Sequence, residues 1–139
     1  MMYGASSTYV KHVEDYCNKN NINFVCLKNS LSAKDIADLR LATDIMVQMS
    51  EFDLLSFSIT ESLYAGSLLI SGNWLPYEIF KENNIYFYEL DELGSSLPKL
   101  ILEIQSNLKF HLEKSSKNSF KNIYPIWDNE IENWNNLYE

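Results

Sequence analysis

The stretch of residues 53–70, DLLSFSITESLYAGSLLI, decides the fold of this chain. It reads as a loop, a helix over residues 56–65, a stop at Gly66 and a buried strand at residues 68–70. Glycine commonly follows the last turn of a helix, and a short apolar run after such a stop is typical of a buried strand. The stretch therefore predicts a helix that leads into the core of a sheet.

Apolar runs and helical patterns alternate along the rest of the sequence. Buried strands are predicted at residues 1–3, 22–27, 45–49, 68–70 and 85–90, with helices between them. This alternation predicts an α/β fold, a Rossmann-like parallel sheet flanked by helices. Ligands of such sheets bind at the carboxyl ends of the strands, so we expect function in the loops after residues 49 and 70.

The length of the chain and its pattern of apolar and polar residues predict one main domain followed by a linker and a C-terminal helix. Residues 1–113 are expected to form the Rossmann-like domain, and residues 114–139 a polar linker and an amphipathic C-terminal helix. The apolar stripe of that helix is Trp127, Ile131, Trp134 and Tyr138. We expect this stripe to pack on a large surface or to form a homodimer contact. The first predicted strand has only about three residues, so the chain is expected to begin inside a fold.

Charge and composition narrow the classes of partner. The net charge of −8 and the pI near 4.7 argue against a nucleic-acid surface, which would need a basic stripe. Cys17 and Cys26 are expected as two buried thiols without a zinc pattern, and His12 and His111 as solvated surface residues. Without a transmembrane stretch or signal-peptide pattern, the expected location is the cytoplasm or the inner face of a membrane.

The start of the helix at residues 56–65 is suited to an anion. Its first turn, Ser56-Phe57-Ser58, would expose unpaired N–H groups at the positive end of the helix dipole. Such a helix start can hold a phosphate or pyrophosphate. Glu61 would repel phosphate but could accept hydrogen bonds from sugar hydroxyls beside it, and Asp53 could do so for a second sugar.

A structural interpretation of the same residues stays open. Ser58 and Glu61 have the spacing of a capping box, in which the glutamate would only satisfy a backbone donor. Similarly, Trp74 and Tyr77 could line a sugar site or could pack their loop onto the sheet.

The central stretch resembles a motif of retaining glycosyltransferases with the GT-B architecture, the group 1 or family 4-like enzymes. Their C-terminal domain carries an acidic residue, seven residues and a second acid, usually in a segment that begins Glu-Gly-Phe-Gly and ends in Glu. Asp53 stands at the first acid, Ser56 at the second glycine, Glu61 at the second acid and Gly66 at the helix stop. The resemblance covers roughly residues 1–105.

The resemblance implies the donor-binding half of such an enzyme. Asp53 would be the catalytic residue, contacting the donor sugar and orienting its anomeric carbon. Backbone amides of Ser56, Phe57 and Ser58 would hold the diphosphate, and Glu61 the ribose. Lys28 would lie near the base, and Gly4 would also be a donor-binding residue. The substrate would be a nucleoside diphosphate sugar, with no separate cofactor or metal.

Three departures from the family pattern shape this expectation. The first acid is Asp53 rather than glutamate, and Leu54 and Ser56 replace both loop glycines. The cations that neutralise the diphosphate in the family would lie upstream of residue 1. We therefore expect a missing N-terminal acceptor domain or partner chain, and an isolated chain that is inactive.

Two other classes of function stay open beside the enzyme. The chain could be a non-catalytic α/β module that binds a nucleotide or phosphate, or a structural protein that pairs through its C-terminal helix. A receiver domain is disfavoured, because Asp44 precedes its predicted strand rather than following it.

Overall fold

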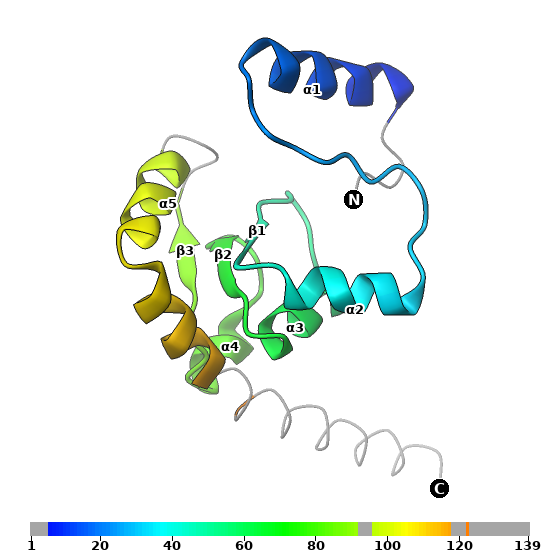
Figure 1. Cartoon of the computed structure of the whole chain (residues 1–139). Helices are drawn as coiled ribbons and strands as arrows, with labels where there is room; N and C mark the ends of the chain where they lie inside the picture. Colours follow the sequence, from blue (N-terminus) through cyan, green and yellow to red (C-terminus); the bar gives the residue numbers. More distant parts are fainter. Residues whose placement is uncertain (1–5, 92–95, 118–121, 123–139) are drawn as a thin grey trace, which may run out of the picture. The chain divides into compact units, whose positions relative to one another are not determined.

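The computed structural model describes residues 6–91, 96–117 and 122 (Figure 1). The chain divides into two compact units, residues 1–36 and residues 37–139, here called the first and the second unit. The predicted strand at residues 1–3 and the C-terminal helix with its tryptophan stripe lie outside the described residues. The predicted boundary near residue 114 stays a prediction.

The first unit consists of helix α1 (Ser7–Lys19), an extended segment and the start of helix α2 (Ala33–Leu41). Ser6 caps α1, because its Oγ accepts a hydrogen bond from the amide of Tyr9 at 3.2 Å. Ser32 caps α2. Its Oγ accepts from the Asp35 amide at 3.2 Å and donates to the Asp35 carboxylate at 2.6 Å.

The predicted strand at residues 22–27 is wrong. This segment is extended but has no strand partner among the residues that the structure describes. Phe24 and Cys26 line a groove along α1, while Val25 between them is 82% exposed. Alternate residues thus cover α1 and face away from it, a burial pattern that a short apolar run cannot distinguish from a strand. Cys26 is accordingly half-buried rather than a core thiol.

The second unit is built on a three-stranded parallel sheet. Strand β1 (Ile45–Gln48) pairs with β2 (Leu68–Gly72), and β2 pairs with β3 (Tyr88–Leu90), in the order β1-β2-β3. Helix α3 (Phe57–Tyr64) joins β1 to β2, and helix α4 (Glu78–Glu82) lies between β2 and β3. The parallel α/β class predicted from the alternation is therefore confirmed.

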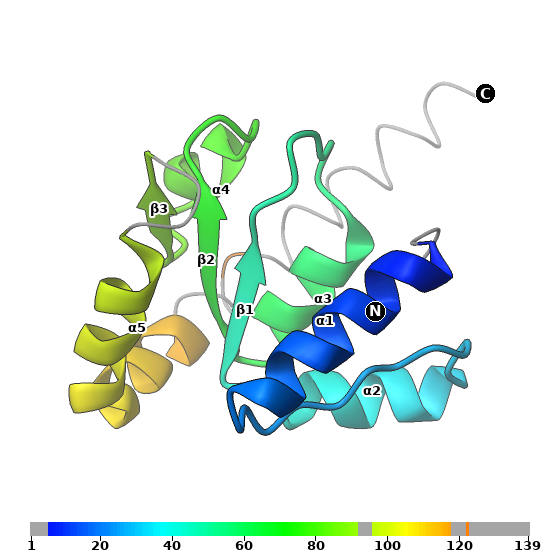
Figure 2. The same cartoon turned by 90° about the horizontal axis from the view of Figure 1, so that it is seen from above.

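Helices cover both faces of this sheet (Figures 1 and 2). On one face, Ile59 and Leu63 of α3 pack with Leu69 of β2 and with Phe80 of α4. On the other face, helix α5 (Leu97–Ser106) contributes Ile104 to a cluster with Leu68, Ile70 and Leu90. Successive residues of β2 thus enter opposite layers, as expected for a strand buried on both sides.

Helix α3 ends close to its predicted position. Gly66 follows α3 with a φ of 97°, a left-handed conformation that favours glycine. Helix α5 ends before Asn107, and a further helical segment covers residues 108–117. The predicted strand at residues 85–90 is shorter, since only β3 pairs with β2.

Serine side chains attach the end of the described chain to the sheet. Ser67 donates to the carbonyl oxygen of Thr43 at 2.7 Å, and Ser115 donates to the carbonyl oxygen of Ser67 at 2.9 Å. Ser115 is fully buried, so residues 114–117 pack as part of the second unit. None of the helices in the described ranges is long and apolar enough to cross a bilayer.

Candidate functional site

The loops that follow β1 and β2 leave the same edge of the sheet. Residues 49–56 connect β1 to α3, and residues 73–77 connect β2 to α4. Because β1 and β2 are parallel neighbours, both loops start at the carboxyl edge. This edge is where the alternation of strands and helices predicts a ligand site.

Asp53 is held at this edge by two hydrogen bonds to a single oxygen. Its Oδ2 accepts from Gln48 Nε2 at 2.8 Å and from the Tyr77 hydroxyl at 2.6 Å. Oδ1 has no hydrogen-bond partner in the described part of the chain. The carboxylate is half-buried, so one oxygen is anchored while the other can still accept a hydrogen bond.

The hydroxyl that anchors Asp53 comes from the core. Tyr77 is 1% exposed and packs with Leu75 and Phe80, whose ring centroid lies 5.4 Å from that of Tyr77. Burial raises the pKa of Tyr77 well above its ordinary value, and the hydrogen bond to Asp53 raises it further. The hydroxyl is thus a firm donor to the carboxylate. Of the two interpretations of this tyrosine, the geometry supports packing onto the sheet.

A second contact ties the two loops together. The indole Nε1 of Trp74 donates to the carbonyl oxygen of Ser50 at 3.0 Å. The same indole lies so close to Gly72 that a Cβ atom there would overlap it. The loops after β1 and β2 are therefore coupled by Trp74 as well as by Tyr77.

The start of α3 has the features expected of an anion site. Ser56 is the N-cap residue with an extended backbone, and its hydroxyl makes no capping hydrogen bond. Leu55, immediately before it, has a φ of 72°, a strained conformation for a leucine. Phe57 is 74% exposed, so the first turn of α3 is open to solvent.

The capping box proposed for Ser58 and Glu61 is not formed. Ser58 lies within α3 rather than at its N-cap position. The Glu61 carboxylate instead pairs with Arg40 of α2, with Nε 3.6 Å from Oε2. The Arg40 Nε is buried and has no hydrogen-bond partner in the described residues, because this distance is too long for one. Glu61 is thus neutralised by a cation that the sequence analysis did not single out.

The predicted site residues do not all converge. Asp53 accepts hydrogen bonds from β1 and from the loop after β2. Glu61 forms its ion pair with a residue of α2. Lys28 belongs to the first unit, where it forms an ion pair with Glu14 at 2.6 Å. Gly4 lies outside the described residues. The candidate site therefore consists of Asp53 and the start of α3, which follow one another in the chain, with Glu61 further along the same helix.

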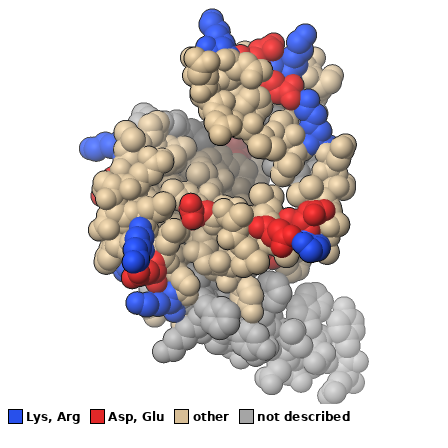
Figure 3. Space-filling model, viewed as in Figure 1, with Lys and Arg blue, Asp and Glu red and all other residues tan. Residues whose placement is uncertain are grey.

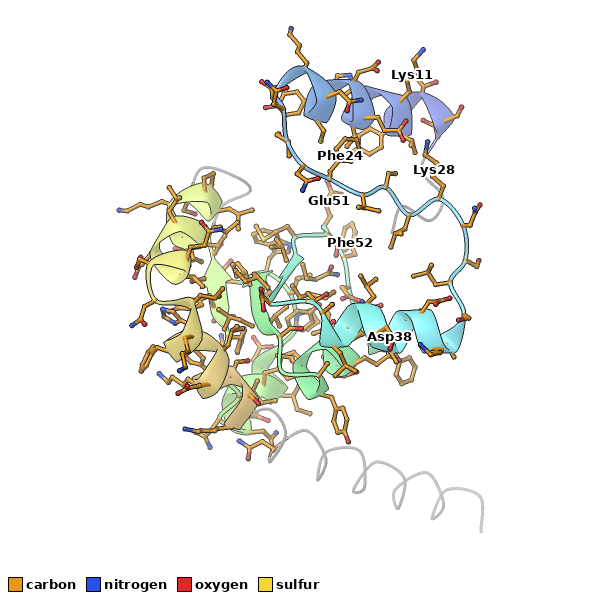
Figure 4. The ribbon with its side chains drawn as sticks, viewed as in Figure 1. Lys11, Phe24, Lys28, Asp38, Glu51 and Phe52 are labelled. Carbon is orange, nitrogen blue, oxygen red and sulfur yellow. The ribbon has the colours of Figure 1, made fainter. Side chains whose placement is uncertain are left out.

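Two exposed apolar side chains flank Asp53 in the loop after β1. Phe52 is 89% exposed and Leu54 is 92% exposed, on either side of the half-buried Asp53. Figure 4 labels Glu51 and Phe52 in this loop after β1. On the face shown in Figure 3, charged side chains form small mixed groups with wide uncharged areas between them. The loop that carries Asp53 thus exposes both apolar side chains and the charged Glu51.

A second polar cluster lies on the opposite helical layer, where the sequence predicted only a surface histidine. His111 Nδ1 is 2.9 Å from the Tyr86 hydroxyl and 3.3 Å from the Tyr88 hydroxyl. Lys114 Nζ lies 4.0 Å from the centre of the Tyr86 ring. Burial raises the pKa of Tyr86 well above its ordinary value. The expectation of a solvated His111 is therefore wrong, because its ring is half-buried against β3 and the residues before it.

Comparisons of the chain with protein-family models, curated proteins and solved structures find no match. Within residues 6–91, 96–117 and 122, no group of three or more His, Cys, Asp or Glu side chains is placed to hold a metal ion.

Proposed function

We propose that this chain is the donor-binding half of a glycosyltransferase, which moves a sugar from a nucleoside diphosphate sugar to a glycan or glycoconjugate. The observation that carries the proposal is the Asp53 carboxylate, anchored through Oδ2 by Gln48 and Tyr77 with Oδ1 left for a ligand. A sugar offers hydroxyl donors to such an oxygen. The position of Asp53, in the loop after β1, agrees with the site expected for a parallel sheet.

The start of α3 supplies the second part of the proposed site. Backbone amides of residues 56–58 would bind the diphosphate, helped by the positive end of the helix dipole. The Ser56 hydroxyl, which makes no capping hydrogen bond, could donate to a phosphate oxygen. Glu61 would bind the ribose. Its 3.6 Å separation from Arg40 leaves both carboxylate oxygens able to accept hydrogen bonds from the ribose.

The proposed reaction is transfer with retention at the anomeric carbon. The bond between this carbon and the diphosphate oxygen breaks, and a bond to an acceptor hydroxyl oxygen forms on the same face of the sugar. The acceptor proton passes to the departing diphosphate. In this scheme Asp53 orients the sugar, and the amides at the start of α3 stabilise charge on the leaving group. An acceptor-binding domain or partner chain would supply the remaining cations and the acceptor.

Titration calorimetry with UDP-glucose, GDP-mannose, UDP and GDP tests the proposal. The wild-type chain should bind at least one nucleotide sugar, and Glu61→Ala should weaken that binding. Glu82→Ala, which removes the same charge from an exposed position on α4, is the matched control and should bind like wild type. Equal binding by wild type and Glu61→Ala would remove the ribose role of Glu61. A chain that binds none of these compounds would contradict the proposed function.

A further inference from the structure

We propose that Tyr77 is a positioning residue for Asp53: its buried hydroxyl fixes the carboxylate so that Oδ1 is presented to the sugar of a nucleotide sugar. This inference rests on the function proposed above. It makes Tyr77 responsible for a higher affinity for the nucleotide sugar than for the same nucleoside diphosphate without the sugar.

The side chain of Tyr77 is held rigidly by the core. Tyr77 is 1% exposed, in a cluster that contains Ile59 of α3 and Phe80 of α4. Side chains in a closely packed core keep one rotamer, so the sheet and its helices determine where the hydroxyl lies. The 2.6 Å hydrogen bond to Oδ2 transfers that fixed position to Asp53.

Asp53 lies between exposed residues of the loop after β1. Phe52 and Leu54, its neighbours, are 89% and 92% exposed, so their side chains bury little surface that could hold the loop. The carboxylate is instead held by Tyr77 and by Gln48 at the end of β1. Both donors bind the same oxygen, which restricts rotation of the carboxylate.

A poorly oriented acceptor weakens the binding of a ligand. A hydrogen bond from a sugar hydroxyl to a freely rotating carboxylate requires that the carboxylate be ordered on binding, which lowers affinity. A carboxylate that is ordered before the ligand arrives avoids this cost. The diphosphate would contact the start of α3 and not Asp53, so Tyr77 should affect only the sugar-dependent part of the affinity.

Tyr77→Phe tests this assignment, because it removes the hydroxyl and keeps the buried ring. Calorimetry should show a loss of about tenfold in affinity for the nucleotide sugar that the wild type binds, the size expected for one charge-assisted hydrogen bond. Affinity for the matching nucleoside diphosphate should be unchanged. Tyr86→Phe is the matched control, since it removes a half-buried tyrosine hydroxyl from the opposite layer of the sheet and should change neither affinity.

Each outcome of this comparison has one meaning. If wild type prefers the nucleotide sugar and Tyr77→Phe keeps that preference, the positioning role is wrong while the proposed function stands. If the wild type binds no nucleotide, the proposed function fails and the positioning role fails with it.

If the Tyr77→Phe variant does not fold, a measurement on the wild-type chain tests the same inference. The hydroxyl proton of Tyr77 should give a slowly exchanging NMR signal that shifts on addition of the nucleotide sugar but not of the nucleoside diphosphate. The same response to both ligands would overturn the inference.

Discussion

The hydrogen bond between Tyr77 and Asp53 should couple these two residues in folding stability. Asp53→Ala leaves the Tyr77 hydroxyl in the core without its acceptor, which should cost about 2 kcal/mol of unfolding free energy. Tyr77→Phe leaves a half-buried carboxylate that still has Gln48 and solvent, so its cost should be nearer to about 1 kcal/mol. The double variant removes both polar partners together.

We therefore expect the double variant to cost less than the sum of the single variants by about 1–2 kcal/mol. Urea unfolding followed by circular dichroism at neutral pH measures the four free energies. Asp53→Ala combined with Tyr86→Phe is the control pair, because Tyr86 belongs to the cluster on the other face of the sheet and should be additive. Additivity of Asp53→Ala and Tyr77→Phe within about 0.5 kcal/mol would refute the reasoning.

Three further predictions concern the core beside the site. Stability should fall as the pH rises above about 10, because the pKa values of Tyr77 and Tyr86 are raised in the folded state. Above the ordinary tyrosine pKa these side chains ionise more readily in the unfolded chain, which favours unfolding. Thermal melts across this pH range should show a smaller fall for Tyr77→Phe. Gly72→Ala should destabilise the chain by about 1–3 kcal/mol and shift the Trp74 indole N–H signal in NMR spectra, since the added methyl group overlaps that ring. Ser71→Ala should leave the urea midpoint unchanged or raise it, because the fully buried Ser71 hydroxyl has no hydrogen-bond partner in the residues that the structure describes; a marked loss of stability would contradict this explanation.

The parallel sheet was predictable because its determinants are local. The apolar run of β2, the apolar face of α3 and the glycine after it are separate signals that agree over residues 53–70. The strand predicted at residues 22–27 was wrong because a strand needs a neighbouring strand to pair with, and a short apolar run does not show whether one is present. Its Phe24 and Cys26 line the groove along α1 instead.

The candidate site was predictable only in part. Asp53 and the start of α3 were found because an acid and a helix start are visible in the sequence. The partners of Asp53 were not, because Tyr77 lies 24 residues further on and reaches Asp53 through tertiary packing. Arg40 was missed as the partner of Glu61 for the same reason, since α2 and α3 are separated by β1.

The most direct test of the central claim is chemical-shift mapping of a nucleotide sugar on the isotope-labelled, full-length chain. UDP-glucose and GDP-mannose are each added to saturation while the backbone amide signals are followed. The account predicts that the largest changes fall on residues 53–61 and on Tyr77, at the carboxyl edge of β1 and β2. Changes confined to other parts of the chain, or none with either compound, would contradict it.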